Sequence, residues 1–257
     1  MSRMRIYLAG LECKLCRGAS DVIVNALSEY GFHKIYALSS FYHINSRYSQ
    51  YIHKFKDFLL DSGAFTFIKK SKDNIDWNKY LERYAGYITE NKIEKFFELD
   101  IDSVVGYEKV KEFRNTLERL TCRRSIPVWH YSRGLDEYLR LCEEYSYVAI
   151  GDIAIGNIKV DDYKYFPYLI REAHKRKCKV HGLGITASSA VKKYHFDTVD
   201  SSSWSGGSRF GSLYFFMNGE IVSRRKIKGL RIKDWKSADI HNLREFLKYQ
   251  EYAENHL

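Results

Sequence analysis

Short apolar runs alternate with amphipathic stretches along most of the chain, and this alternation constrains the fold more than any other feature. The runs with the length of a strand are residues 5–10, 34–39, 58–61, 96–100, 127–131, 147–151, 179–182 and 196–200. The stretches between them repeat apolar side chains at the period of an amphipathic helix, most clearly at residues 76–90. The order predicts an α/β fold, a (β/α)8 TIM barrel, with a doubly wound open sheet as the alternative.

The chain divides into two parts by its pattern. It has 257 residues, and a barrel of this type takes about 250. Residues 1–211 carry the eight runs, so we expect the barrel there. The remaining residues, 212–257, predict a basic hairpin and helix that pack on the barrel: strands at 212–217 and 221–225 around an Asn-Gly turn, then a helix at 238–253.

Composition excludes several classes of protein. Hydrophobic residues make up 45% of the chain, which rules out global disorder. There is no run of about 18 apolar residues and no signal-peptide pattern, so we expect a cytoplasmic protein with no membrane span. The five cysteines are odd in number and sparse, which favours reduced thiols. Cys13 and Cys16 form a CxxC pair without a second pair at zinc-site spacing, so we expect no metal at this pair. We also expect no cofactor.

Basic residues are in excess, with a formal net charge of +10. Such a balance favours a polyanionic partner. Seven Lys and Arg residues lie between Arg224 and Lys236, against the single acid Asp234. We expect Arg224, Arg225 and Lys226 to contact nucleic-acid phosphate, with a merely solvated basic face as the alternative. Arg209 is a further phosphate candidate, unless its segment is a plain surface loop.

Polar residues gather where the predicted strands end. In a TIM barrel these carboxyl ends form the active-site mouth. The residues in question are Asp61, Asp100, Asp102, His130, Gly151, Asp152, Gly182, Gly184 and Asp200. Each carboxylate alone could cap a helix, but together they indicate nucleophilic or acid–base work on an electron-poor carbon. A Mg²⁺ site made from Asp61, Asp100, Asp102 and Asp152 is the competing interpretation.

Five segments in this region, in order between residues 58 and 211, resemble motifs of the tRNA-guanine transglycosylases. They are LDSGAF at 60–65, similar to "DSGGFQ"; LDI at 99–101; IGDIAIG at 150–156, similar to "IGGLAVG"; HGLGI at 181–185, similar to "LMGVG"; and DSSSW at 200–204, similar to "FDSASY". The chain departs from that family in two ways. No Cys follows Cys178, so the family's zinc site is missing, and Trp129-His130 replaces a base-reading Gln. The chain is also short and resembles more closely the compact relatives that place 7-deazaguanines into DNA.

The resemblance implies a pentosyltransferase that exchanges guanine in DNA for a free 7-deazaguanine base through a covalent Asp–glycosyl intermediate. It implies Asp200 as the nucleophile and Asp61 as the acid–base residue. Asp197 is the alternative nucleophile, because residues 196–199 also look like a bacterial nucleophile segment. The implied substrate-binding residues are Ser62, Asp100, His130, Gly151, Asp152 and Gly182.

Residue chemistry is consistent with this implied role for Asp100. An ionised carboxylate accepts the adjacent N1–H and amine donors of guanine and rejects adenine, which presents an acceptor at N1. Three alternatives stay open: the same exchange on tRNA, a non-catalytic barrel that binds nucleic acid, and a Mg²⁺-dependent hydrolase. A helper protein or a second copy of the chain is a further expected partner.

The basic tail gives a direct test. Replacing Arg224, Arg225 and Lys226 with Ala should weaken DNA binding alike on all sequences, because phosphate contacts carry no sequence information. The slope of log K against log salt should fall by roughly 0.7–0.9 for each contact removed. Fluorescence anisotropy titrations measure this slope, and an unchanged slope would identify these residues as a solvated face.

Overall fold

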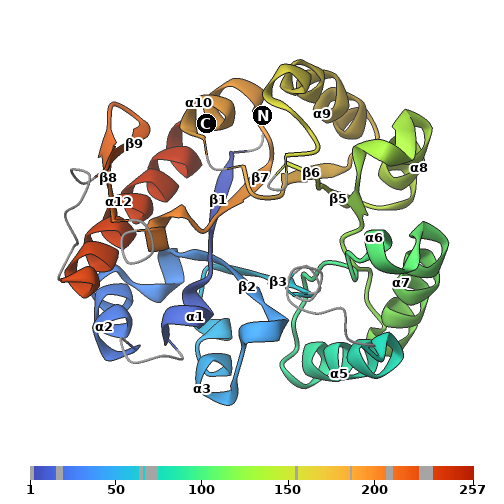
Figure 1. The fold of residues 1–257 in the computed structure, drawn as a ribbon, viewed down its shortest axis with the longest axis horizontal. Helices are drawn as coiled ribbons and strands as arrows, with labels where there is room; N and C mark the ends of the chain where they lie inside the picture. Colours follow the sequence, from blue (N-terminus) through green and yellow to red (C-terminus); the bar gives the residue numbers. More distant parts are fainter. Residues whose placement is uncertain are drawn as a thin grey trace.

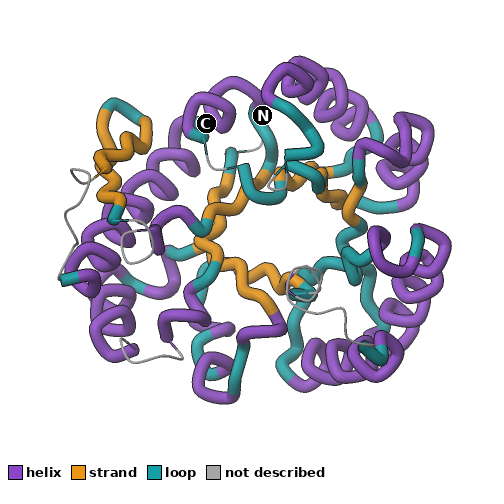
Figure 2. Tube along the Cα trace, viewed as in Figure 1, coloured by secondary structure: helices purple, strands orange, loops and turns teal. Residues whose placement is uncertain are grey.

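A sheet of seven parallel strands curls around the centre of the molecule, with helices outside it (Figures 1 and 2). This computed structural model describes residues 3–15, 20–63, 66, 75–153, 156–185, 187–206, 211–225 and 234–257. The strand order is β3-β2-β1-β7-β6-β5-β4. The strands are β1 (Arg5–Ala9), β2 (Tyr36–Ser40), β3 (Asp57–Asp61), β4 (Val128–Trp129), β5 (Tyr147–Ile150), β6 (Lys179–Gly182) and β7 (Thr198–Ser201).

Two isolated parallel bridges join the edges of this sheet. Leu60 of β3 pairs with Phe96, and Phe97 pairs with Ile126, just before β4. Phe97 N donates to Leu60 O at 2.9 Å, and Ile126 N donates to Phe96 O at 2.8 Å. The fourth predicted strand, residues 96–100, is therefore present but shortened to these bridges. They complete a ring of parallel segments, which confirms the TIM-barrel prediction over the open sheet.

Helices cover the outside of the ring (Figure 2). Those with regular α geometry are α1 (Leu11–Leu15), α2 (Ser20–Tyr30), α3 (Ser46–Ser49), α5 (Trp77–Glu90), α6 (Asp102–Val105), α7 (Tyr107–Thr121), α8 (Gly134–Glu144), α9 (Phe166–Lys175) and α10 (Ser188–Tyr194). Asp76 caps α5 by accepting a hydrogen bond from Lys79 N. Among the described residues, no helix is long and apolar enough to cross a membrane.

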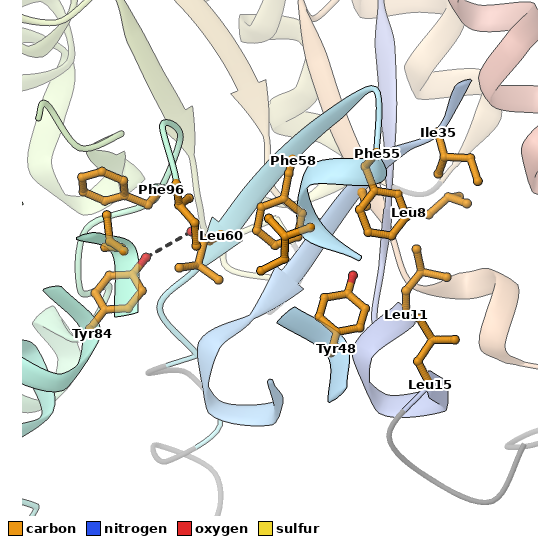
Figure 3. Packing of buried hydrophobic residues seen from close by; sticks show 14 of the residues in the cluster. Leu8, Leu11, Leu15, Ile35, Tyr48, Phe55, Phe58, Leu60, Tyr84 and Phe96 are labelled. Atoms are coloured by element: carbon orange, nitrogen blue, oxygen red, sulfur yellow. Dashed lines mark hydrogen bonds between the residues drawn. The ribbon is translucent and has the colours of Figure 1, made fainter. Parts of the chain in front are cut away.

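Buried side chains hold the shortened strand in place. Tyr84 of α5 points toward Leu60 (Figure 3), and its hydroxyl lies 3.1 Å from Leu60 O and 3.0 Å from Phe97 O. On the other side, the buried Glu98 carboxylate accepts from Val128 N at 2.7 Å and from Arg114 Nε at 2.6 Å. These contacts replace the ladder bonds that a longer strand would make.

The C-terminal segment forms the predicted hairpin and helix. Strands β8 (Ser212–Met217) and β9 (Glu220–Arg225) are antiparallel, and lie outside the ring in Figure 1. The Asn218-Gly219 turn has φ of 52° and 75°, as the predicted turn requires. Helix α12 (Trp235–His256) is longer than residues 238–253 at both ends and packs against β1. Its Gln250 side chain bonds to the backbone of both β1 and β2.

The buried ion pair between Glu98 and Arg114 leads to a prediction about stability. Glu98→Ala leaves the Arg114 guanidinium buried without its partner, and breaking a buried pair in this way costs about 3–5 kcal/mol of the free energy of unfolding. Glu144→Ala is the control, because that exposed carboxylate pairs with Arg124 and Arg140 at the surface and should change stability by less than about 1 kcal/mol. Urea denaturation measures both variants. Equal losses of stability in the two variants would show that Glu98 does not hold the shortened fourth strand in place.

Candidate active site

A cavity of about 1280 Å³ opens at the carboxyl ends of the strands. This is the end where TIM barrels carry their active sites. Its described wall is rich in titratable groups: Glu12, Asp61, Asp100, Asp102, Glu108, Lys111, His130, Arg133, Glu137, Asp152 and Asp200. Acidic groups outnumber basic ones in this wall, so their mutual repulsion governs the chemistry of the site.

His130 lies between two of these carboxylates. Its Nε2 is 2.6 Å from Asp100 Oδ1, and its Nδ1 is 2.9 Å from Asp152 Oδ1. Burial disfavours a charge on the ring, but the two hydrogen bonds outweigh burial and raise the pKa of His130 to about 10. The imidazole is therefore a cation at neutral pH that donates to both carboxylates. In turn, the bond from His130 outweighs burial at Asp152 and lowers the pKa of that carboxyl.

The backbone of Gly151 and Asp152, directly after β5, leaves room for His130 and holds the Asp152 carboxylate beside it. A Cβ on Gly151 would lie 2.9 Å from Val128 Cγ1 and 3.1 Å from His130 Cε1, so a side chain there would displace the histidine. Asp152 has a left-handed φ of 64°, a conformation that Asp tolerates better than most residues. Its second oxygen accepts from Tyr131 N at 3.1 Å, which fixes the carboxylate facing His130.

Asp200, at the end of β7, lines the cavity. Its Oδ1 accepts a hydrogen bond from Gly184 N at 2.7 Å and lies 3.3 Å from Nε2 of the buried His181. Asp197, the alternative nucleophile, is held away from the cavity at the other end of β7. It accepts from Val180 N and bonds His174 Nε2, both at 2.8 Å. Of the two candidates, only Asp200 lines the described cavity.

Asp61 ends β3 and faces the same cavity. Burial, followed by the charges of Asp100, Asp200 and Glu12, raises the pKa of Asp61 to about 7. Gly63 N donates to its Oδ2 at 3.2 Å. Gly63 has a φ of +73°, and a Cβ there would lie 2.5 Å from Ser40 Oγ. The glycine of the DSG sequence is therefore required for the turn that holds the Asp61 carboxyl.

Glu12 is a wall residue that the sequence analysis missed. It follows β1, is only 2% exposed, and accepts from Ser40 N at 3.2 Å. Burial raises the pKa of Glu12 to about 7. The one signal in the sequence was an acidic residue shortly after a predicted strand.

Two predicted substrate contacts lie outside the cavity. Ser62 is buried behind the wall, where its carbonyl accepts from Tyr80 Oη at 2.5 Å. A Cβ on Gly182 would lie 2.5 Å from Ile185 Cδ1 and 3.2 Å from Phe196 Cδ1, so this position faces the core. Gly184 lines the cavity in its place. Neither Ser62 nor Gly182 is in the described cavity wall, and contact of these residues with a substrate stays a prediction.

The predicted phosphate contacts are only partly within the described residues. Arg209, Lys226 and the side chain of Arg225 lie outside them. Arg224 is exposed on β9, with its guanidinium carbon 5.4 Å from the centre of the Phe215 ring. Its place on the hairpin is compatible with a solvated face and with a phosphate contact.

Asp100, Asp102 and His130 could in principle hold a metal ion, because one ligand atom from each lies within 4.8 Å of the others. The hydrogen bonds argue against this use. Both ring nitrogens of His130 face carboxylates and donate to them when the ring is charged, which leaves no lone pair for a metal. Asp102 pairs with Arg133 Nη2 at 2.8 Å. The donor set fits organic acid–base chemistry better than metal binding.

Comparisons with solved structures show the fold alone. A proposed fructose-1,6-biphosphate aldolase from Coccidioides immitis has a TM-score of 0.51 at 11% identity, over 98% of this chain and 88% of that one. The carboxyl transferase domain of Rhizobium etli pyruvate carboxylase, with 3-bromopyruvate, has a TM-score of 0.51 at 14% identity. That match covers 97% of this chain, which spans about half (48%) of the other. No protein-family model matches the sequence, and no curated protein is similar to it.

The His130 cluster predicts how stability depends on pH. The pKa of His130 is about 10 when folded and about 6.5 when unfolded. Its stabilising contribution is therefore complete below pH 6.5 and is lost as pH rises toward 10. The difference in melting temperature between the wild type and His130→Gln should shrink across this range. Asp152→Asn removes one carboxylate partner of His130, so the stabilising contribution of His130 should be lost at lower pH. A difference that stays constant from pH 6 to 10 would contradict a charged His130.

Proposed function

We propose that this protein is a guanine transglycosylase, which replaces guanine in DNA with a free 7-deazaguanine. The observation that carries the proposal is the placement of Asp200 and Asp61 in one cavity with different environments. Asp200 accepts a backbone N–H bond from Gly184, whereas burial and neighbouring carboxylates raise the pKa of Asp61 to about 7. Two carboxyls in one cavity, one of them with a raised pKa, are the usual equipment for glycosyl transfer.

In this reaction Asp200 attacks C1′ of the target nucleotide. The bond from C1′ to N9 breaks, a bond from Asp200 Oδ to C1′ forms, and N9 of the departing guanine takes a proton from Asp61. The incoming base then gives its N9 proton to Asp61 while N9 attacks C1′ and releases Asp200. Protons and electrons balance over the cycle, and the reaction needs no cofactor. Guanine is protonated most easily at N7, which a 7-deazaguanine lacks. A 7-deazaguanine therefore leaves less readily than guanine, and the exchange favours its net insertion into DNA.

Asp100 is the proposed reader of the base. Its Oδ1 lies 2.6 Å from His130 Nε2, and this hydrogen bond fixes the orientation of the carboxylate. A carboxylate has lone pairs for further donors, and guanine presents N1–H and an amine side by side. Adenine presents an acceptor at N1 and would meet repulsion. In this proposal His130 and Asp152 orient Asp100 and do not contact the base, while Gly151 brings a backbone close to the ligand.

The nucleic-acid substrate is supported by the charge of the whole chain. The net charge is +10, although the cavity itself is acidic, so the attraction must come from surface outside the cavity. C1′ is shielded in a duplex, and an enzyme that attacks it must first take the nucleotide out of the stack. DNA is preferred over tRNA because the sequence resembles the compact members that act on DNA.

A covalent intermediate is the most specific prediction of this proposal. Wild-type protein incubated with guanine-containing DNA and no incoming base should give a slow-migrating species on a denaturing gel. Asp200→Asn should abolish it, because an amide oxygen is a poor nucleophile. Asp197→Asn is the matched control and should retain the species in its folded fraction, since Asp197 lies away from the cavity. The opposite result for these two variants would make Asp197 the nucleophile.

A metal-dependent hydrolase is the second candidate, because one ligand atom each of Asp100, Asp102 and His130 lies within 4.8 Å of the others, although the hydrogen bonds of His130 and Asp102 favour base exchange over it. The two proposals differ in their response to chelation. Base exchange through Asp200 should be unchanged in EDTA, as measured by incorporation of radiolabelled base into DNA. Loss of turnover in EDTA and recovery with Mg²⁺ would favour the hydrolase.

A further inference from the structure

His181 contacts the Asp200 carboxyl from inside the barrel and takes no part in the proton transfers of the proposed reaction. It begins the HGLGI segment, lies on β6 and is fully buried. Its Nε2 is 3.3 Å from Asp200 Oδ1, and its Nδ1 is 2.7 Å from Thr198 Oγ1. Each nitrogen of this buried ring therefore has a polar partner on the neighbouring strand, β7.

The geometry of the two strands explains why one ring reaches both partners. Thr198 and Asp200 are two residues apart on β7, so their side chains point to the same face of the sheet. His181 pairs with Thr198 in the parallel register. Three aromatic rings surround the imidazole, with centres 5.3–6.4 Å from its own: those of Tyr7, Phe97 and Tyr147. This close packing restricts rotation of the ring.

The hydrogen bonds indicate where the proton of the ring lies. The proposed nucleophile is a carboxylate, which only accepts hydrogen bonds, so the nitrogen that faces Asp200 has to donate. Nδ1 then accepts from the Thr198 hydroxyl. Tyr147 Oη lies 2.5 Å from Thr198 Oγ1 and can donate to it, whereas its distance of 3.5 Å from Nδ1 is long for a hydrogen bond. In this order every atom of the chain has a complementary partner.

Two donors meet on one oxygen of Asp200. Gly184 N donates to Oδ1 at 2.7 Å, and His181 Nε2 approaches the same atom. Within the described part of the chain, Oδ2 makes no hydrogen bond. Hydrogen bonds stabilise the negative charge on the oxygen that accepts them, so Oδ2 keeps the more available lone pairs.

We propose that His181 is a positioning residue, a neutral imidazole protonated on Nε2, which holds Asp200 Oδ1 so that Oδ2 attacks C1′. This inference rests on the proposed function, since it assigns the attacking atom of that reaction. In the attack the bond from Oδ2 to C1′ forms, the bond from C1′ to N9 breaks, and the departing guanine takes its proton from Asp61. The proton of His181 stays on Nε2 throughout, and Thr198 keeps Nδ1 an acceptor.

¹⁵N NMR of the free protein tests the state of the ring without any substrate. In the wild type, the His181 signals, assigned by their loss in His181→Gln, should show a protonated Nε2 and an unprotonated Nδ1. In Thr198→Val the Nδ1 signal should move to that of a free acceptor, while Nε2 keeps its proton. A wild-type ring that is protonated on Nδ1, alone or together with Nε2, would overturn the inference.

Rates of adduct formation test the positioning role. With saturating guanine-containing DNA and no incoming base, His181→Phe should form the Asp200 adduct roughly 10–100-fold more slowly than the wild type, because a misplaced nucleophile loses rate. DNA affinity, measured by fluorescence anisotropy, should be unchanged. His181→Gln keeps an N–H donor in place of Nε2 and should recover most of the rate. His174→Gln is the matched control and should react as the wild type does, because His174 bonds Asp197 and not Asp200.

These rates are compared on the folded fraction of each variant, measured by circular dichroism. Equal rates in His181→Phe and the wild type would overturn the inference, and so would equal losses in His181→Phe and His181→Gln. If His181→Phe does not fold, the ring spectra of the wild type still decide the inference. A wild type that makes no adduct would instead refute the proposed function, and with it the attack by Oδ2, whatever the spectra show of the ring.

Discussion

Crowding of carboxyl groups in one cavity is the constraint on which the structure of this protein depends. The closed ring of parallel strands sends Asp61, Asp100, Asp152 and Asp200 to the same mouth. Their repulsion is relieved in two ways. The His130 cation lies between Asp100 and Asp152 and lowers the pKa of Asp152, while burial raises the pKa values of Asp61 and Glu12 to about 7. The cavity thereby contains carboxyls with lowered and raised pKa values, which the proposed glycosyl transfer would use.

The fold was predictable from the sequence because the apolar runs coincide with the strands of the structure. Seven of the eight predicted strands are regular, and the C-terminal hairpin follows from its Asn-Gly turn. The shortening of the fourth strand was not predictable. Phe96 and Phe97 are as apolar as any strand, but Tyr84 and Glu98 take up hydrogen bonds that would otherwise extend the ladder. Such contacts come from distant parts of the chain and leave no local pattern.

The site was predictable only where a motif or a strand end identified it. The predicted residues Asp61, Asp100, His130, Asp152 and Asp200 all line the cavity, although their roles remain proposals. Ser62 and Gly182 were assigned by motif and do not line the described cavity. Glu12 was missed because one acidic residue after a strand has no distinctive spacing, and its importance depends on burial beside Ser40.

Nucleoside mass spectrometry tests the central claim most directly. DNA and tRNA would be digested from cells that produce a 7-deazaguanine and express either the wild type or Asp200→Asn. The account predicts a 7-deazaguanine nucleoside in DNA with the wild type and none with the variant. DNA that carries no modified nucleoside in either strain, or equal amounts in both, would contradict base exchange by Asp200, and modification found only in tRNA would contradict DNA as the substrate.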